Sequence, residues 1–220
     1  FDKPFVARNS VSRSFIIYRA IKAIYNGYTP TVFELGAGCG YLGALLISEN
    51  WPYYSTDNAQ AFYLYQNRLW NYFSNNELRE ILEFTSIPDE KKAKVVHIPW
   101  WNFFLQDMPN SVDLITCNHM LAEMNPIALK YSVYRMRNLL TKSDSIESGP
   151  PKLLMFEHWG GENTNTKENV FKELMNAGFR LIYHSSITKS NKMNISIFAL
   201  YDNIYGDSFY ELSNSVMNAL

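Results

Sequence analysis

A glycine-rich segment carries the most specific chemistry in the sequence. In the run 32-VFELGAGCGYLGALL-46, Gly36, Ala37, Gly38 and Gly40 follow one apolar stretch and precede another. Glycine lacks a Cβ and tolerates positive φ, so such a loop can turn sharply after a strand, let a ligand approach the backbone and pack a helix close by. The segment therefore predicts a ligand-binding loop between a strand and a helix.

The glycine spacing alone fits two kinds of ligand. Counted from Gly38, the residues match the G-x-G-x-x-G pattern of loops that hold a dinucleotide pyrophosphate. Counted from Glu34, they read as an acid followed by Leu-Gly-Ala-Gly-x-Gly, with a carboxylate near the end of the strand. A carboxylate repels a pyrophosphate and attracts a ligand that carries a sulfonium and a free amino group. Glu34 therefore favours the cationic ligand.

Asp57 and Asn58 place further polar groups at the end of the next predicted strand. The acid lies about 20 residues beyond the glycines, where nucleotide-binding folds hold ribose hydroxyls with a carboxylate. Both candidate ligands contain a ribose. Asp57 therefore predicts a nucleoside without distinguishing between them.

Histidines are the candidates for proton transfer, because their ordinary pKa lies near neutrality. Among the four in the chain, His119 and His158 directly follow predicted strands. A base there would activate an alcohol acceptor by taking its proton, and we assign this role to His119, with His158 as the competitor. Glu123 lies four residues after His119, on the same face if a helix begins there, and is expected to orient the histidine or the acceptor. A surface hydrogen-bonding role for His119 and a structural role for Glu123 stay open.

These residues lie within an alternation of strand-like and helix-like segments. Apolar and β-branched runs predict strands over residues 31–35, 51–57, 94–98, 112–117, 153–156, 181–188 and 195–201. Apolar residues at helical spacing predict helices over residues 10–27, 41–49, 59–73, 77–84, 126–140, 166–178 and 207–220. The pattern predicts a doubly wound, mainly parallel seven-stranded α/β sheet of Rossmann-like type.

The last two predicted strands are joined by the short polar segment 189-KSNKMN-194. A parallel crossover needs a dozen or more residues, so these strands must form an antiparallel hairpin. A dinucleotide-binding dehydrogenase would instead continue with a second βαβ half. The hairpin therefore also argues against the dinucleotide.

The run 33-FELGAGCG-40, Asp57 and the closing hairpin together resemble class I S-adenosylmethionine-dependent methyltransferases over about residues 31–201. A narrower resemblance is to bacterial sugar O-methyltransferases, carried by 15-FIIYRAIKAI-24, 57-DNAQAFYLYQ-66 and 113-DLITCNHMLAEM-124. The resemblance implies S-adenosylmethionine as the cofactor and a sugar or another small hydroxyl compound as the acceptor.

The resemblance also assigns the cofactor contacts. It implies that the three loop glycines line the methionine end with Glu34 nearby, and that Asp57 binds the ribose. It places Asn118, with His119, near the transferred methyl group. It sets the residues after the third long strand, Pro99, Trp100 and Trp101, beside the adenine. The family often has a small residue and an acid there, so "PWW" departs from the pattern, and a tryptophan stacked on the base or packed in the core are both open.

Charge and composition exclude several other classes. The net charge is −1, from 20 basic and 21 acidic residues, which argues against a general nucleic-acid partner. The sequence 118-NHML-121 stands where enzymes that methylate amino groups of DNA bases have an Asn-Pro-Pro-Tyr type motif. No apolar run reaches the length of a membrane span, and no His or Asp spacing predicts a metal. Two cysteines favour a reducing compartment, and hence the cytoplasm.

We divide the chain into a helical segment over 1–30, a cofactor-binding core over 31–201 and a helical tail over 202–220. The tail has three open roles, which are covering the sheet, pairing with a second copy in a homodimer, and leading into a further region. The sequence begins at Phe1, as expected of a fragment or a processed chain. The alternatives to a sugar methyltransferase are an enzyme that methylates another small molecule or a protein side chain, and a non-catalytic cofactor-binding module of a larger protein.

Overall fold

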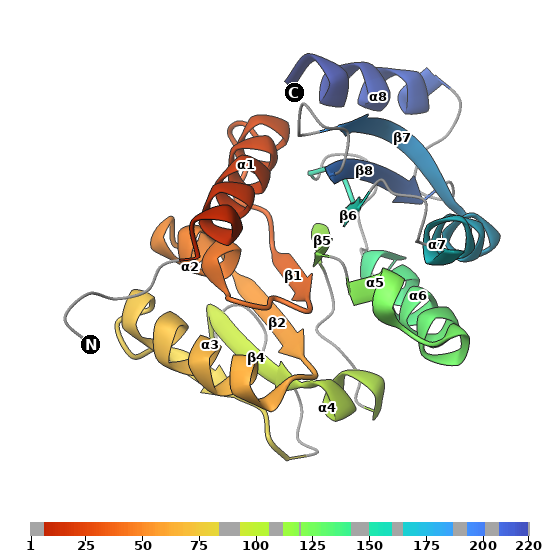
Figure 1. The fold of residues 1–220 in the computed structure, drawn as a ribbon. Helices are drawn as coiled ribbons and strands as arrows, with labels where there is room; N and C mark the ends of the chain where they lie inside the picture. The colour runs from red at the N-terminus through yellow and green to blue at the C-terminus, as the bar shows by residue number, and fades with distance from the viewer. Residues whose placement is uncertain are drawn as a thin grey trace.

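The computed structural model describes residues 7–83, 93–105, 112–118, 120–141, 150–159, 165–186, 193–200 and 207–219. Within these ranges eight strands form one sheet, with helices on both sides of it (Figure 1). The strands are β1 (Val32–Leu35), β2 (Tyr53–Asp57), β3 (Leu78–Glu80), β4 (Val95–Pro99), β5 (Leu114–Asn118), β6 (Leu153–Trp159), β7 (Phe179–Ser186) and β8 (Met193–Leu200). The helices are α1 (Arg8–Ile24), α2 (Tyr41–Ser48), α3 (Gln60–Phe73), α4 (Trp100–Leu105), α5 (Met120–Glu123), α6 (Pro126–Thr141), α7 (Asn165–Asn176) and α8 (Asp207–Ala219).

The strand order is β3-β4-β2-β1-β5-β6-β8-β7. Strands β3, β4, β2, β1, β5 and β6 pair in parallel, whereas β8 is antiparallel to both β6 and β7. The predicted doubly wound sheet and its antiparallel ending are therefore confirmed, but the described residues form eight strands and not the predicted seven. Because the parallel strands point the same way, their carboxyl ends lie along one edge, where ligands bind in open α/β sheets.

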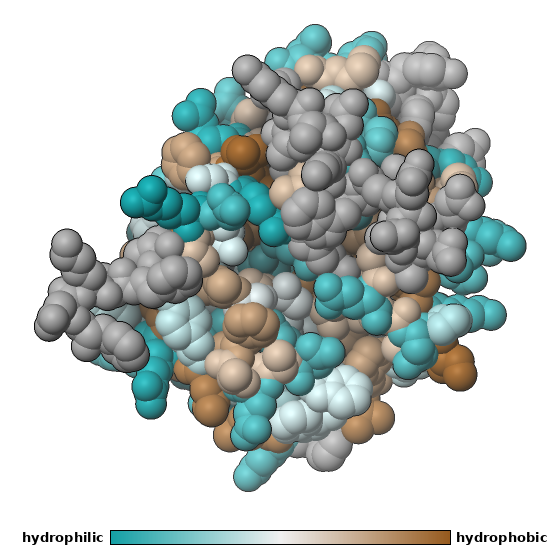
Figure 2. Space-filling model, viewed as in Figure 1, coloured by the Kyte–Doolittle hydropathy of each residue, from teal (hydrophilic) through white to brown (hydrophobic). Residues whose placement is uncertain are grey.

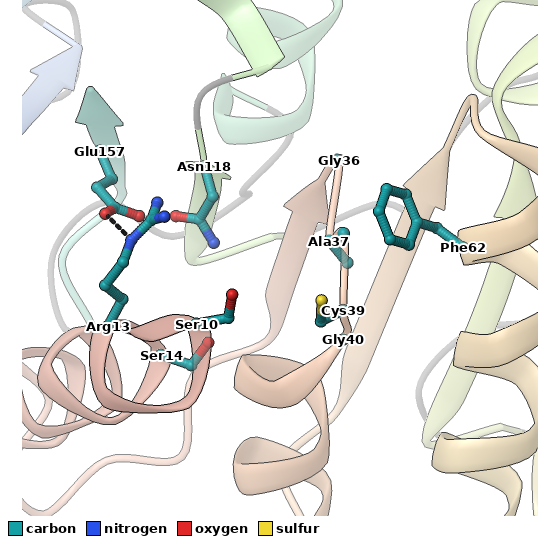
Figure 3. Close-up of a pocket in the computed structure, with 11 residues that line it drawn as sticks. Ser10, Arg13, Ser14, Gly36, Ala37, Cys39, Gly40, Phe62, Asn118 and Glu157 are labelled. Carbon is teal, nitrogen blue, oxygen red and sulfur yellow. Dashed lines mark hydrogen bonds and ion pairs between the residues drawn. The ribbon is translucent and has the colours of Figure 1, made fainter. Parts of the chain in front are cut away.

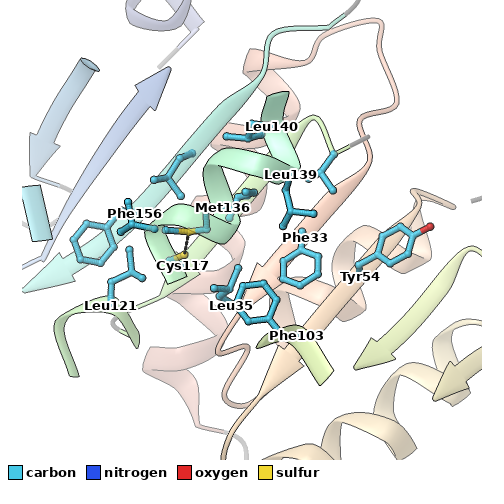
Figure 4. Close-up of a cluster of buried hydrophobic side chains, with 14 of the residues drawn as sticks. Phe33, Leu35, Tyr54, Phe103, Cys117, Leu121, Met136, Leu139, Leu140 and Phe156 are labelled. Atoms are coloured by element: carbon cyan, nitrogen blue, oxygen red, sulfur yellow. Dashed lines mark hydrogen bonds between the residues drawn. The ribbon is translucent and has the colours of Figure 1, made fainter. Parts of the chain in front are cut away.

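Side chains alternate between the two faces of each strand, so each face has its own apolar core. On one face, Phe33, Leu35 and Phe156 pack with residues of α4, α5, α6 and α7 (Figure 4). On the other, Val32 and Met155 pack with residues of α1, α2, α3 and α8. This alternation decides which polar residues of a strand face α1 and which face α7.

The predicted helix over residues 77–84 is wrong. Residues Leu78–Glu80 form β3, which pairs in parallel with β4 at the edge of the sheet. The continuing chain is held by Ile81, whose N–H donates to His97 O at 3.0 Å and whose carbonyl accepts from Asn102 Nδ2 at 2.7 Å. So short a helix is marginal in water, and the open edge of β4 supplies hydrogen bonds that outweigh local periodicity.

The C-terminal helix covers part of the sheet beside α1, which is one of the three roles considered for the tail (Figure 1). Val216 of α8 is buried in the same core as Ile17 and Ile182, and Ser213 Oγ donates to Ile182 O at 3.0 Å. None of the helices in the described ranges combines the length and apolar character needed to cross a bilayer.

Gly43 of α2 packs directly against side chains of β2 and α3. A Cβ at this position would lie 2.5 Å from Tyr53 Oη and 2.8 Å from Trp70 Nε1. Both neighbours are fully buried large side chains, so neither has room to move aside.

We expect Gly43→Ala to lower the free energy of unfolding by about 1–3 kcal/mol through overpacking. Helix propensity alone would change it by roughly 1 kcal/mol in the opposite direction. Urea unfolding measures the difference, with Ser48→Ala at the exposed end of the same helix as the control. A stabilised Gly43→Ala variant would show that the close approach does not exist in solution.

Candidate functional site

The glycine loop connects β1 to α2 at the carboxyl edge of the sheet. Gly36, Gly38 and Gly40 have φ values of 68°, 54° and 70°, a backbone conformation that residues with a side chain rarely adopt. A Cβ at Gly36 would lie 2.7 Å from Met120 Sδ, whereas one at Gly38 would meet no atom within 4 Å. Gly36 is therefore required by packing against α5, and Gly38 borders open space where a ligand can approach the backbone.

Asp57 ties the loop to the neighbouring strand. Its Oδ2 accepts hydrogen bonds from Gly38 N at 3.0 Å and Gln66 Nε2 at 2.8 Å, and its Oδ1 accepts one from Ala59 N at 2.9 Å. A carboxylate can accept about four hydrogen bonds, so these three leave capacity for one more on Oδ1. The side chain predicted to bind a ribose thus also fixes the shape of the loop.

A cavity of about 180 Å³ opens beside the loop (Figure 3). One side of it consists of the loop residues Gly36, Ala37, Gly38, Cys39 and Gly40, with Phe62 of α3 next to them. The facing wall is polar and consists of Ser10, Arg13, Ser14, Asn118 and Glu157. In the space-filling view, hydrophilic and hydrophobic side chains both lie over α1 and over α3 (Figure 2).

The polar wall depends on α1, which the sequence analysis did not include in the site. The stripe of α1 that faces the protein is apolar at Ile17 and Ile21, which are buried. One and two turns earlier the same stripe carries Ser14 and Ser10, with Arg13 beside them. A change from apolar to polar residues along one helical stripe was the signal that this end of α1 faces a site and not the core.

Arg13 and Glu157 form an ion pair across this wall. Arg13 Nε donates to Glu157 Oε1 at 2.8 Å, and Figure 3 shows the two side chains pointing toward each other from α1 and β6. The Glu157 side chain is 1% exposed and that of Arg13 is 26% exposed. Burial raises the pKa of Glu157, while Arg13 opposes that rise by stabilising the carboxylate. The sequence analysis named His158 but not its neighbour Glu157, which the structure makes a wall residue.

Glu34 lies behind the loop and not on the cavity surface. It is fully buried and accepts hydrogen bonds from Tyr53 Oη at 2.5 Å and from Asn118 Nδ2 at 2.9 Å. Burial raises the pKa of Glu34 to about 8, although both hydrogen bonds oppose the rise. The group therefore carries less negative charge near pH 7 than the sequence argument assumed. Its contact with the cavity passes through Asn118, which does line it.

Of the three predicted proton-transfer residues, the structure describes His158 and Glu123. His158 follows Glu157 and so points to the opposite face of the sheet, where it is buried, with its Nε2 2.9 Å from Ser196 Oγ and its ring beside Phe171. Glu123 is exposed at the end of α5. His119 lies outside the described residues, and its role stays a prediction.

The residues predicted to lie beside adenine are next to Asp57. Asp57 pairs with Pro99 in the β2–β4 register, and Trp100 and Trp101 open α4 directly after it. Trp100 is 42% exposed and Trp101 is 47% exposed, so neither is a core tryptophan. Asn58 is also exposed at this edge. Among the described residues, no three His, Cys, Asp or Glu side chains converge as a metal site would require.

Comparison with known proteins identifies the fold. No family model and no curated protein matches the sequence. Solved structures do match, including the glycopeptide N-methyltransferase MtfA complexed with sinefungin (10% identity, TM-score 0.59, 87% of this chain and 86% of that one). A TehB-like SAM-dependent methyltransferase from Corynebacterium glutamicum has 11% identity, a TM-score of 0.59 and coverage of 88% and 93%. The magnesium protoporphyrin IX methyltransferase ChlM from Synechocystis PCC 6803, with bound SAH, has 12% identity, a TM-score of 0.59 and coverage of 90% and 89%.

The chain has the class I methyltransferase fold. The antiparallel β7–β8 pair at the end of the sheet belongs to this fold and not to the two-half dehydrogenase arrangement. Because the sequence identities are near 10%, this likeness shows a shared fold and nothing further.

The buried Glu34 makes stability depend on pH. An acid whose pKa is about 8 when folded and 4.5 when unfolded keeps a proton that the unfolded chain has lost. Its contribution therefore lowers folding stability as pH rises between these two values. We expect the free energy of unfolding of Glu34→Gln to rise relative to that of the wild type as pH increases over this window, by up to roughly 1.4 kcal/mol per pH unit.

Urea unfolding at pH 5, 6, 7 and 8 measures this difference, and Glu123→Gln, at an exposed site, is the control. Parallel stability curves for the wild type and Glu34→Gln would contradict the assignment, because they would mean that Glu34 titrates alike in both states.

Proposed function

We propose that the protein is an S-adenosylmethionine-dependent methyltransferase that methylates a hydroxyl group of a small polar acceptor, such as a sugar. The observation that carries the proposal is the cavity between the glycine loop and the polar wall. It lies at the carboxyl edge of β1, β5 and β6, which is the ligand-binding edge of an open α/β sheet.

The charges around this cavity suit a cationic nucleoside better than a dinucleotide. A pyrophosphate site usually supplies backbone N–H groups together with cationic side chains. Here Gly38 N already donates to Asp57, and the described lining residues include one cationic side chain, Arg13, for the two phosphates of a dinucleotide. When bound, S-adenosylmethionine supplies a methyl carbon on a positively charged sulfur, and the carboxylate of Asp57, bonded to the loop at Gly38, offers this charge favourable electrostatics.

The residues present fit such a donor. Gly38 borders open space that a side chain would fill, so the amino-acid end can lie against the backbone of the loop. Asp57 has capacity for a ribose hydroxyl, and Trp100 and Trp101 lie next to it with half-exposed rings for the base. Asn118 is held by Glu34 through its Nδ2, so its Oδ1 is the atom turned to other partners.

The polar wall supports a hydroxyl-bearing acceptor. Ser10, Ser14, Asn118 and Glu157 offer hydroxyl, amide and carboxylate groups, which are the groups that hydrogen-bond alcohols. Methyl transfer needs close positioning of donor and acceptor and removal of the acceptor's proton. In this proposal His119, which directly follows the wall residue Asn118 in the sequence, removes this proton, and Glu123 orients His119.

Calorimetric titration tests the donor. We expect saturable binding of S-adenosylmethionine and S-adenosylhomocysteine, and none of NAD. Asp57→Ala should weaken the adenosyl ligands about 10-fold or more, since it removes a charged hydrogen-bond acceptor and frees Gly38 N.

Asp113→Ala is the matched control for this titration. Asp113 also accepts a backbone hydrogen bond, from Thr31 N at 2.8 Å, and pairs with Lys152, but it lies at the start of β5, at the opposite edge of the sheet. It should lose stability without losing donor affinity. Binding of NAD alone would overturn the methyl donor.

Turnover on a panel of sugars tests the base. We expect His119→Gln to reduce methyl transfer about 100-fold or more while S-adenosylhomocysteine binds as before. His158→Gln should keep turnover close to that of the wild type, because His158 faces α7. The reverse pattern would exchange the two roles, and donor binding without turnover on any acceptor would favour a non-catalytic module.

A further inference from the structure

The polar wall has an uneven distribution of charge. Among the described residues that line the cavity, Arg13 is the one cationic side chain. Asp57 and Glu34 lie behind the loop on the other side, and each is within one hydrogen bond of a lining residue. The cavity therefore has two carboxyl groups behind the loop and the Arg13–Glu157 pair on the α1 side.

Arg13 is fixed in direction by a buried partner. Glu157 accepts from Nε at 2.8 Å and is 1% exposed, so it has little freedom to turn. Guanidinium has five N–H donors in a planar fork, which allows it to bind a second carboxylate beside the first.

We propose that Arg13 binds the α-carboxylate of the donor's amino-acid end, and that Glu157 is the positioning residue that aims Arg13 at it. This inference rests on the proposed function, because it assumes a donor with a free amino-acid end. The donor's single negative group then meets the wall's cation, and its sulfonium lies toward the carboxyl groups around the glycine loop.

A purely structural ion pair would behave differently. Arg13 and Glu157 are 144 residues apart and join α1 to β6, so the pair could act only as a tie between these elements. Loosening such a tie would weaken every ligand of the cavity by a similar factor. A carboxylate-binding arginine instead distinguishes ligands by whether they carry a carboxylate.

Three ligands separate these two roles. S-Adenosylhomocysteine carries the whole amino-acid end, its decarboxylated analogue keeps only the amine, and 5′-methylthioadenosine lacks both. Each is titrated calorimetrically into the wild-type protein and into Arg13→Met, Glu157→Gln and the double variant Arg13→Met/Glu157→Gln. The double variant is needed because removing Arg13 alone takes the cation away from a buried carboxylate, which destabilises the protein and attracts amines.

We expect the wild type to prefer S-adenosylhomocysteine over its decarboxylated analogue by about 10-fold to 100-fold, the range of a charged hydrogen bond. The double variant should lose this preference and bind 5′-methylthioadenosine as the wild type does. Glu157→Gln should reduce the preference without removing it. Thermal unfolding confirms that each variant is folded.

Two results would overturn the inference while leaving the proposed function intact. One is a double variant that keeps the full preference for the carboxylate. The other is an equal loss of affinity for all three ligands, which would make the pair a structural tie. A wild-type protein that binds none of the three would overturn the proposed function, and this inference with it.

Discussion

The site depends on the parallel register of β1 with its two neighbours. Leu35 at the end of β1 is level with Thr56 of β2 and Cys117 of β5, so the loops that follow all three strands leave the sheet together. β6 continues the arrangement, with Glu157 opposite Asn118. A shift of one residue in any of these pairings would turn Glu157, Asn118 or Glu34 to the α7 side. The apolar residues between them prevent this shift, because they would leave their core at the same time.

Buried polar groups then give the loop one shape. Asp57 binds Gly38, and the Glu34 carboxyl joins Tyr53 to Asn118. Each bond replaces contacts with water that burial has removed, so the network is stable only while every partner is present. The same low-dielectric surroundings that raise the pKa of Glu34 make the group sensitive to any positive charge placed nearby.

The fold was largely predictable from the sequence because its signals are local. The glycine loop, the end of β2 at Asp57 and the short connection between β7 and β8 each reflect neighbouring residues. The strand at Leu78 was not predictable, since its hydrogen bonds come from the open edge of β4 and not from its own periodicity. The face of the sheet to which a single side chain points was equally hard to predict from the sequence. His158 and Glu157 are adjacent in the sequence, and only the pairing of β6 decides that Glu157 faces the cavity wall and His158 faces α7.

The contact between Arg13 and Glu157 also has a consequence for how the protein is made. The glycine loop and Asp57 come from residues close together in the sequence, and Asn118 also precedes β6, so they can assemble earlier during synthesis. The Arg13–Glu157 contact of the opposite wall cannot form until β6 has been synthesised, about two-thirds of the chain after α1. Until then the loop has no facing wall, and the cavity is a groove open to water. Ligand binding would thus report that the last parallel strand is in place, and a nascent chain halted before β6 would hold the ligand poorly.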